Sequence, residues 1–286
     1  MAQEKTSIFG LLGFPVKHSF SPAMHNAAFK HLKINARYGL FEKKPQELED
    51  FLNSLARQNI CGLNVTIPYK ERVLDFVELD KESFYLREIR AVNTIVVEGG
   101  ILKGFNTDIP GFSKHLKEQI DPLNKKTAIL GAGGAGRAVA YVLASSKAKE
   151  IAIYDIDRKK SQGVVDLIKK VFLNFNIEAV GRIEDLNIKE KDLLVNATPI
   201  GMEKTDPYLV TEEMLYKDLF VYDLIYNPPQ TKLLALAKKV GAKTSNGLGM
   251  LLYQGVLSFG HFTGVDAPVE IMRQALTKEL EKCRKF

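Results

Sequence analysis

The chain has 286 residues, 45% of them hydrophobic, and its 40 Lys and Arg against 34 Asp and Glu leave a formal charge of +6. This composition is typical of a folded globular protein, and the length predicts one large or two medium domains. The positive excess is small and scattered, which argues against a nucleic-acid partner but suits an anionic small substrate and cofactor.

The sequence predicts neither a signal peptide nor a membrane-spanning segment. Residues 1–7 are too polar for a signal peptide, and the longest apolar run, residues 8–16, is interrupted by glycines and a proline. Cys61 and Cys283 show no CxxC or metal-ligand spacing, which is typical of free thiols in a reducing compartment. We therefore expect a soluble, cytoplasmic protein with no membrane partner and no bound metal.

Strand-like and helix-like segments alternate in the first part of the chain. Helical spacing of apolar residues predicts helices over 22–32, with Ser21 as its N-cap, and over 45–57. The expected strands are 7–12, 36–41, 61–66 and a hairpin of 94–97 with 101–104 around Gly99-Gly100.

After Pro110 the alternation becomes more regular. A helix over 109–119, capped by Asp108, is followed by four strands alternating with helices, at 127–130, 150–154, 193–196 and 220–223. This predicts a parallel sheet with helices on both faces, whereas residues 174–188 give no clear assignment. The last helices, 250–259 and 269–284, are expected to return to the first domain, so that two domains enclose a cleft.

The run Gly131-Ala-Gly-Gly-Ala-Gly136 lies between the strand 127–130 and a helix predicted over 137–144. Its glycines fit G-x-G-x-x-G, in which the first permits a tight turn, the second lets a pyrophosphate approach and the third lets the helix pack on the strand. Bare backbone N–H groups and the positive end of the helix dipole would bind the phosphates. We interpret this segment as a dinucleotide site.

Asp155 follows the next strand, nineteen residues after Gly136. A carboxylate at this position accepts a hydrogen bond from the 2′-OH of an adenosine ribose and repels a 2′-phosphate, which favours NAD. The following cations Arg158, Lys159 and Lys160 could neutralise a phosphate or simply form the polar face of the next helix. Our hypothesis is that NAD is at least accepted.

Polar residues gather at the expected ends of elements in the first domain. Ser19 and Ser21 flank Phe20 just before a helix, where two hydroxyls and the helix N-terminus could bind a carboxylate, although Ser21 could also be only an N-cap. We interpret His18 and His25 as hydrogen-bonding histidines rather than metal ligands.

Asn64 and Thr66 share one face of a strand end, and Lys70 is expected in the first turn of a following helix. Asn93 and Asp108 lie at the two ends of the predicted hairpin, where Asp108 could hold the Lys70 ammonium charged and oriented. Such a set of donors and acceptors suits a polyhydroxylated ligand.

The chain resembles the shikimate dehydrogenase family over essentially its whole length. Each matching stretch is modest alone, but their joint order is specific: 13–22 (GFPVKHSFSP), 64–70 (NVTIPYK), 91–94 (AVNT), 104–108 (GFNTD), 131–136 (GAGGAG), 196–198 (NAT), 223–228 (DLIYNP) and 247–254 (GLGMLLYQ).

The resemblance implies a role for each matching position. Lys70 would be the catalytic lysine with Asp108 as its partner, and Ser19 and Ser21 would anchor the substrate carboxylate. The implied readers of the substrate hydroxyls are Asn64, Thr66, Asn93, Gln254 and the nearby Tyr226. The implied cofactor contacts are Gly131, Ala132, Gly133, Gly134, Ala135 and Asp155, with Asn196, Thr198, Leu224 and Gly247 on the nicotinamide side.

Two departures from the family pattern stand out. Arg90 replaces the glycine that usually precedes the AVNT stretch, so this turn is expected to differ. Asp155-Ile156-Asp157 replaces the Asn-Arg-Thr of NADP-using members, which puts the usual NADP preference in doubt. The presence of both Ser19 and Ser21 favours shikimate over quinate.

We therefore expect two α/β domains, a substrate-binding catalytic domain of residues 1–108 plus 248–286 and a Rossmann-like doubly wound domain of residues 109–247. The expected activity is the reversible NADP- or NAD-dependent reduction of 3-dehydroshikimate to shikimate, by a monomer or homodimer. The alternatives are an NAD-dependent quinate/shikimate dehydrogenase, a non-catalytic dinucleotide-binding sensor and a folate-type dehydrogenase. A sensor would need neither Lys70 nor Asp108, and a folate-type enzyme would need no paired serines.

Overall fold

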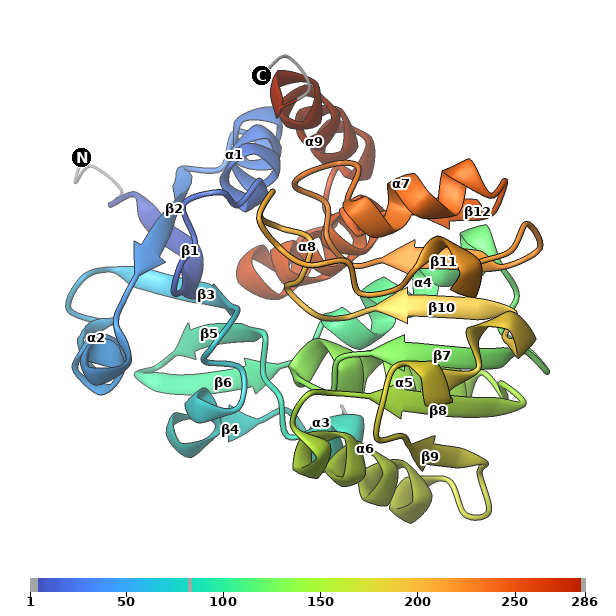
Figure 1. The fold of residues 1–286 in the computed structure, drawn as a ribbon. Coiled ribbons are helices and arrows are strands. Elements are labelled where there is room, and N and C mark those ends of the chain that lie inside the picture. The colour runs from blue at the N-terminus through green and yellow to red at the C-terminus, as the bar shows by residue number, and fades with distance from the viewer. Residues whose placement is uncertain (1–4, 82–83, 284–286) are drawn as a thin grey trace. The chain divides into compact units, whose positions relative to one another are not determined.

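The computed structural model describes residues 5–81 and 84–283, and the side chains of Phe84, Arg87 and Cys283 lie outside what it describes. The chain divides into two compact units. The first runs to Gly111 and resumes at Leu251, and the second spans Phe112–Met250. Each unit has its own six-stranded sheet with helices against it, which confirms the α/β fold predicted from the sequence (Figure 1).

The sheet of the first unit is mixed, in the order β2-β1-β3-β5-β6-β4. Its strands are β1 (Ser7–Gly13), β2 (Ala36–Glu42), β3 (Ile60–Val65), β4 (Glu78–Leu79), β5 (Thr94–Glu98) and β6 (Ile101–Phe105). The hairpin β5–β6 forms as predicted, with Gly99 and Gly100 both at positive φ. Asn64 pairs with Thr94 and Thr94 with Phe105, so the end of β3, the start of β5 and the end of β6 meet at one edge.

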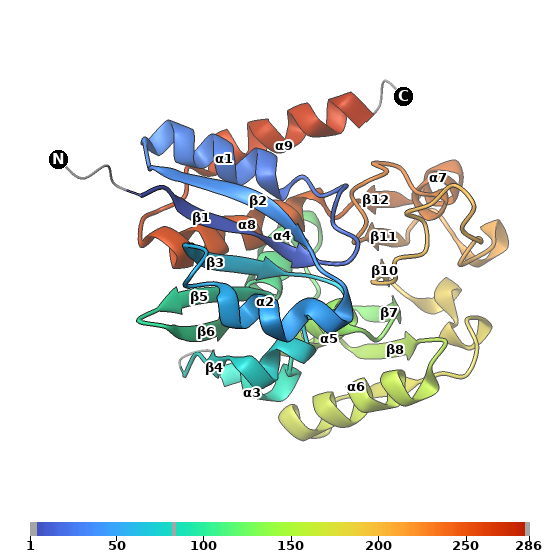
Figure 2. The same ribbon diagram turned by 90° about the vertical axis from the view of Figure 1, so that its left-hand side faces the viewer.

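Both faces of this sheet are covered by helices (Figure 2). The helices are α1 (Ser21–Leu32), α2 (Leu48–Ser54), α3 (Phe84–Ile89), the start of α4 (Asp108–Gln119), most of α8 (Leu248–Thr263) and α9 (Val269–Cys283). Because side chains alternate along a strand, Phe9 and Leu12 of β1 face opposite sides. Phe9 packs on the rings of Phe29 and Phe262, and Leu12 belongs to a cluster with Leu48 of α2.

The sheet of the second unit is parallel at every described strand pair. Its order is β12-β11-β10-β7-β8-β9, built from β7 (Lys126–Leu130), β8 (Glu150–Tyr154), β9 (Ile177–Ala179), β10 (Leu193–Asn196), β11 (Phe220–Asp223) and β12 (Lys243–Ser245). Read from β9, this is the doubly wound order 3-2-1-4-5-6 of dinucleotide-binding folds. The helices are α5 (Gly134–Ser145), α6 (Arg158–Val171) and α7 (Lys232–Lys239).

Several local expectations were wrong. The helix expected over 45–57 is a 3₁₀ turn, Pro45–Glu47, followed by the short α2. Lys70 lies in a turn before the 3₁₀ segment Arg72–Phe76 and not in a helix. Residues 174–188, which gave no assignment, contain β9 and a 3₁₀ turn. Short 3₁₀ segments lack the apolar periodicity from which an α-helix is predicted.

Two expected helix caps were also wrong. Helix α1 begins at Ser21 itself, so Phe20 is the N-cap and no side chain caps that end. At α4 the Oδ1 of Asn106 accepts from the backbone N–H groups of Asp108 and Ile109, at 3.0 and 3.2 Å. Asn106 therefore performs the capping expected of Asp108, whose carboxylate is left for another contact.

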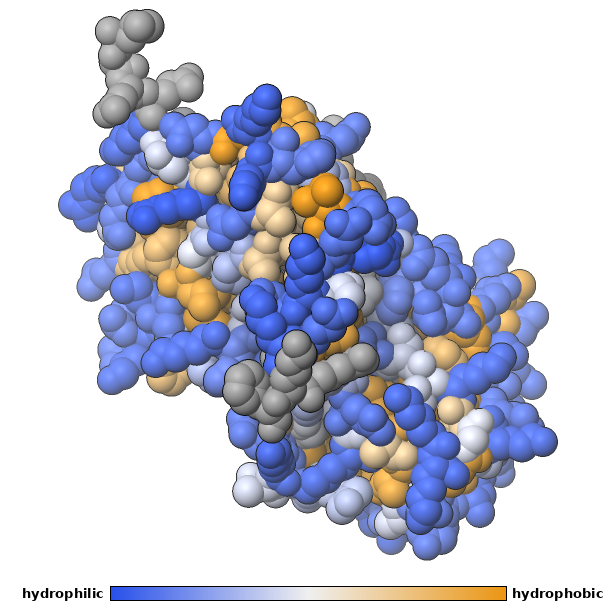
Figure 3. Space-filling model, turned by 90° about the horizontal axis from the view of Figure 1, so that it is seen from above, coloured by the Kyte–Doolittle hydropathy of each residue, from blue (hydrophilic) through white to orange (hydrophobic). Residues whose placement is uncertain are grey.

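Arg90 has a φ of +51°, in the left-handed region that glycine adopts most easily. The turn before the AVNT stretch therefore has a backbone conformation suited to glycine despite the arginine. Within the described part of the chain, no helix is long and apolar enough to cross a membrane. Figure 3 shows a face covered mainly by hydrophilic side chains, with apolar ones in small patches.

Candidate active site

Lys70 and Asp108 form an ion pair in the first unit. Nζ lies 2.6 Å from Oδ2, and the two side chains are only 17% and 7% exposed. Lys70 reaches this point from the turn after β3, and Asp108 from the first turn of α4, where the helix dipole favours an anion. The structure thus brings together the two residues that the sequence predicts to be catalytic.

Beside this pair, Asn93 is held in one orientation by its neighbours. Its Oδ1 accepts from the backbone N–H of Thr107 at 2.7 Å, and its Nδ2 donates to Thr107 Oγ1 at 3.0 Å. Thr107 in turn directly precedes Asp108. Sequence reasoning assigned Thr107 no role, although it lies within the quoted stretch 104–108, because nothing local showed that it would face Asn93.

Asn64 ends β3 and is 4% exposed. Its Oδ1 accepts from Tyr38 of β2 at 2.8 Å and from Ser258 of α8 at 3.4 Å. Its Nδ2 donates to Thr94 Oγ1 at 3.1 Å and to the Asn93 carbonyl at 3.4 Å. Every hydrogen-bonding position of this amide is engaged within the protein, so its role in binding a substrate hydroxyl stays a prediction.

The paired serines lie next to each other at the start of α1, which begins with Ser21. Ser19 Oγ donates to Ser21 Oγ at 3.2 Å and accepts from the Ser21 backbone N–H at the same distance. Ser21 is buried and Ser19 is partly exposed. Because hydroxyls rotate freely, both can turn toward an incoming carboxylate without moving the backbone.

Thr66 and Gln254 lie on two further elements of the first unit. Thr66 follows β3, and its Cγ2 would be 2.4 Å from a Cβ added at Gly13, so the ends of β3 and β1 approach closely. Gln254 is on α8, and a Cβ added at Gly111 of α4 would be 2.7 Å from its backbone nitrogen. Gln254 therefore lies against the helix that begins with Asp108.

In the second unit, the glycine segment connects β7 to α5 as predicted. Gly131 has a φ of +97°, and a Cβ added at Gly136 would lie 2.1 Å from the Gly131 carbonyl oxygen. No atom would lie within 4 Å of a Cβ added at Gly133, the N-cap of α5, and no side chain caps that helix. The backbone N–H groups of Gly134 and Ala135 begin α5, and this geometry fits a dinucleotide pyrophosphate.

Asp155 lies at the end of β8 and reaches back to the glycine segment. Its Oδ2 accepts from the Ala132 N–H at 2.7 Å, and its Oδ1 accepts from the Asp157 N–H at 2.9 Å. Ile156, next in the chain, is 94% exposed. The N–H of Ala132, expected to face the cofactor, is thus used within the protein, and the carboxylate lies beside the segment expected to hold the phosphates.

The remaining predicted cofactor residues lie at the carboxyl ends of three strands: Asn196 ends β10 and Thr198 follows it, Leu224 follows β11, and Gly247 lies between β12 and α8. Asn196 Oδ1 accepts from Thr198 Oγ1 at 2.7 Å. Leu224 donates its N–H to the Asn196 carbonyl at 2.9 Å, and a Cβ added at Gly247 would be 1.8 Å from the Leu224 oxygen. Tyr226 lies two residues after Leu224. The close approach of Gly247 to the Leu224 carbonyl leaves no room for a side chain at position 247.

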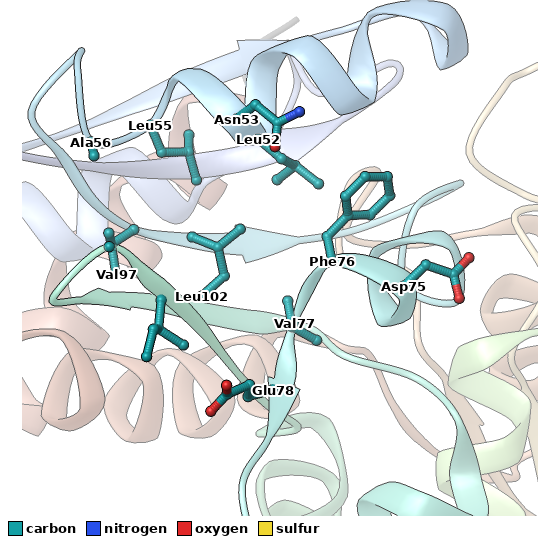
Figure 4. A pocket seen from close by; sticks show the side chains of 12 residues that line it. Leu52, Asn53, Leu55, Ala56, Asp75, Phe76, Val77, Glu78, Val97 and Leu102 are labelled. Atoms are coloured by element: carbon teal, nitrogen blue, oxygen red, sulfur yellow. The ribbon is translucent and has the colours of Figure 1, made fainter.

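A cavity of about 460 Å³ lies elsewhere in the first unit, between α2 and the hairpin β5–β6 (Figure 4). Leu52, Leu55, Val97 and Leu102 point into it, with Asp75 and Glu78 near its edge. None of the predicted site residues lines it. Over residues 5–81 and 84–283, no group of three or more His, Cys, Asp or Glu is arranged to hold a metal ion.

Comparison with known proteins identifies the family. The family model for the shikimate dehydrogenase substrate binding domain matches residues 11–95, and that for the shikimate 5′-dehydrogenase C-terminal domain matches residues 247–277. A shikimate dehydrogenase (NADP(+)) from Methanopyrus kandleri is 44% identical over 96% of this chain and 97% of its own.

Solved structures agree with this match. A shikimate dehydrogenase from Aquifex aeolicus superposes with a TM-score of 0.87 at 35% identity, covering 96% of this chain and 99% of its own. A shikimate 5-dehydrogenase from Listeria monocytogenes, in complex with shikimate and NAD, gives 0.82 at 34% identity over 95% and 96%. The chain belongs to the shikimate dehydrogenase family.

Proposed function

We propose that this chain catalyses the reversible reduction of 3-dehydroshikimate to shikimate, in chorismate and aromatic amino acid biosynthesis. The observation that carries the proposal is the ion pair of Lys70 with Asp108, placed among the polar residues at one edge of the first sheet. A bound nicotinamide dinucleotide would supply the hydride that the ketone carbon accepts.

Lys70 has the chemistry that this reaction needs from the protein. Negative charge grows on the ketone oxygen during reduction, and an ammonium within hydrogen-bond reach stabilises that charge and donates the proton. Asp108 keeps Nζ in place at 2.6 Å. In the direction of oxidation Lys70 must first lose its proton, so the rate of shikimate oxidation should rise with pH.

The other predicted residues would supply the substrate contacts. Ser19 and Ser21 offer two hydroxyl donors to the substrate carboxylate, and their contact at 3.2 Å lets both reach one group. The hydroxyls of the substrate ring would form hydrogen bonds with Thr66, Asn93 and Gln254. Asn64 and Tyr226 would make the remaining contacts.

The second unit would hold the cofactor. The open space at Gly133 and the uncapped start of α5 suit the pyrophosphate, and Asn196, Thr198, Leu224 and Gly247 would line the nicotinamide side. The name of the Methanopyrus relative supports NADP.

A second cofactor is favoured by a specific observation. At the position where NADP-using members of the family carry Asn-Arg-Thr, this chain has the fixed carboxylate of Asp155 and the exposed, uncharged side chain of Ile156. A carboxylate there accepts from a ribose 2′-OH and repels a 2′-phosphate. We infer that NAD is accepted, and initial rates with both cofactors test this; strict dependence on NADP would refute it.

Steady-state rates on shikimate and quinate, each with NAD and NADP, test the function as a whole. We expect shikimate to be oxidised and quinate to be the poorer substrate, because both Ser19 and Ser21 are present. Formation of reduced cofactor with shikimate excludes a non-catalytic sensor, and its absence with either cofactor contradicts the proposal. We further propose a cytoplasmic monomer or homodimer with no nucleic-acid or membrane partner.

A further inference from the structure

Asp223 is a buried carboxylate at the functional edge of the second sheet. It is the last residue of β11, is 0% exposed, and lies opposite Asn196, the last residue of β10. In open parallel sheets, ligands bind at this carboxyl edge of the strands. Its position therefore differs from that of an ordinary core residue in the middle of a strand.

The carboxylate connects three segments of the second unit. Oδ1 accepts from Asn196 Nδ2 at 2.9 Å and from the Ile225 N–H at 3.1 Å. Oδ2 accepts from Thr231 Oγ1 at 2.6 Å. Asp223 thus links the end of β10, the loop after β11 and the start of α7.

These contacts continue into both loops. The same Asn196 side chain accepts through Oδ1 from the N–H and Oγ1 of Thr198, at 3.0 and 2.7 Å. The Ile225 carbonyl accepts from the Gly247 N–H at 3.1 Å. Fixing Asp223 therefore fixes Thr198 on one side and Gly247 on the other.

The chemistry of these partners explains why a carboxylate stands at this position. All three neighbours present donors, and an ionised carboxylate accepts from all of them without presenting a donor of its own. Burial acts against the charge and raises the pKa of Asp223 to about 6, while the hydrogen bonds from Thr231, Ile225 and Asn196 act in the opposite direction. Donors at both oxygens are the partners that an ionised carboxylate requires.

We propose that Asp223 is a positioning residue that fixes the loops after β10 and β11 so that they can bind the nicotinamide half of the dinucleotide. This inference rests on the function proposed for the second unit. It assigns Asp223 no contact with the cofactor, and its effect passes through Asn196 and Ile225.

Binding titrations with two probes test this directly. The probes are the reduced dinucleotide that the parent prefers and the adenosine diphosphate half of that dinucleotide. In Asp223→Ala the buried donors lose their acceptor, so we expect the reduced dinucleotide to bind at least about tenfold more weakly. The adenosine half, held at the glycine segment, should bind within about twofold of the parent, because the lost contacts do not involve that segment.

Two further variants separate positioning from a general loss of stability. Asp223→Asn keeps an oxygen toward Asn196 and Ile225 and turns an NH₂ toward Thr231 Oγ1, which accepts instead of donating once its hydroxyl rotates. The dinucleotide should therefore bind within about threefold of the parent. Lys191→Met removes a similarly buried contact, the 2.5 Å ion pair with Glu150 at the opposite edge of the sheet, and should leave both probes bound as in the parent.

The inference is overturned if Asp223→Ala binds the dinucleotide as the parent does, or if both probes weaken equally. Should Asp223→Ala fail to fold, Thr231→Val removes one donor to the same carboxylate and must weaken the dinucleotide more than its adenosine half, or the inference is wrong. A parent that binds dinucleotide but does not oxidise shikimate would contradict the proposed function while leaving this test of Asp223 intact.

Discussion

His25 should make the first unit sensitive to acid. Its ring is fully buried on α1 and stacked on Tyr38 with centroids 4.3 Å apart. The sequence-based interpretation of His25 as a hydrogen-bonding histidine was wrong, because neither ring nitrogen has a partner among the described residues. Burial lowers the pKa of His25 from 6.5 to about 3. The folded protein therefore keeps this ring neutral at a pH where the unfolded chain binds a proton.

The linkage between protonation of His25 and folding sets the sign and the size of the loss of stability in acid. Because the pKa is lower in the folded state, stability is fully present above about pH 6.5 and is lost as the pH falls below it. With an unfolded pKa of about 6.5, going from pH 7 to pH 5 should remove about 2 kcal/mol from the free energy of unfolding.

Urea unfolding at pH 7 and pH 5 measures this loss. His25→Leu cannot take up the proton, so the variant should lose about 2 kcal/mol less than the parent between the two pH values. His31→Gln, on the exposed side of the same helix, should behave as the parent. Equal losses for His25→Leu and the parent would refute the reasoning.

Three further substitutions probe the two units. Asp108→Asn removes the carboxylate partner of the buried Lys70 ammonium. Urea unfolding should show a free energy of unfolding lower by about 2–4 kcal/mol, and initial rates should show a lower kcat. Unchanged stability would contradict the ion pair. Tyr38→Phe removes a hydrogen-bond donor to Asn64 and should lower the free energy of unfolding by about 1 kcal/mol. It should also raise the KM for shikimate at nearly constant kcat. A parent-like KM would show that Asn64 needs no support from Tyr38. Gly136→Ala would place a Cβ against a backbone oxygen and should weaken dinucleotide binding in a fluorescence titration by more than about tenfold, whereas parent-like binding would disprove the close contact.

Much of the architecture could be predicted from local sequence signals. The glycine segment, the alternation of strands and helices after Pro110 and the Gly99-Gly100 hairpin each depend on residues close together in the chain. The pairing of Lys70 with Asp108 is implied by the resemblance to the family and agrees with the position of both residues at the ends of elements of one domain.

The remaining features depend on contacts between distant segments. Tyr38 and Ser258 both reach Asn64, from β2 and from α8, and no spacing in the sequence connects these three residues. Asn106 rather than Asp108 caps α4, because the Asp108 carboxylate is taken by Lys70. The two side chains compete for one role, and only the folded structure shows which of them fills it.

The most direct test of the catalytic assignment is a comparison of kcat and KM for shikimate between the parent and Lys70→Ala. If the ammonium transfers the proton and stabilises the developing charge, kcat should fall by about 10²–10⁴-fold while KM changes far less. A variant that turns over shikimate at the parent rate would contradict the assignment of Lys70.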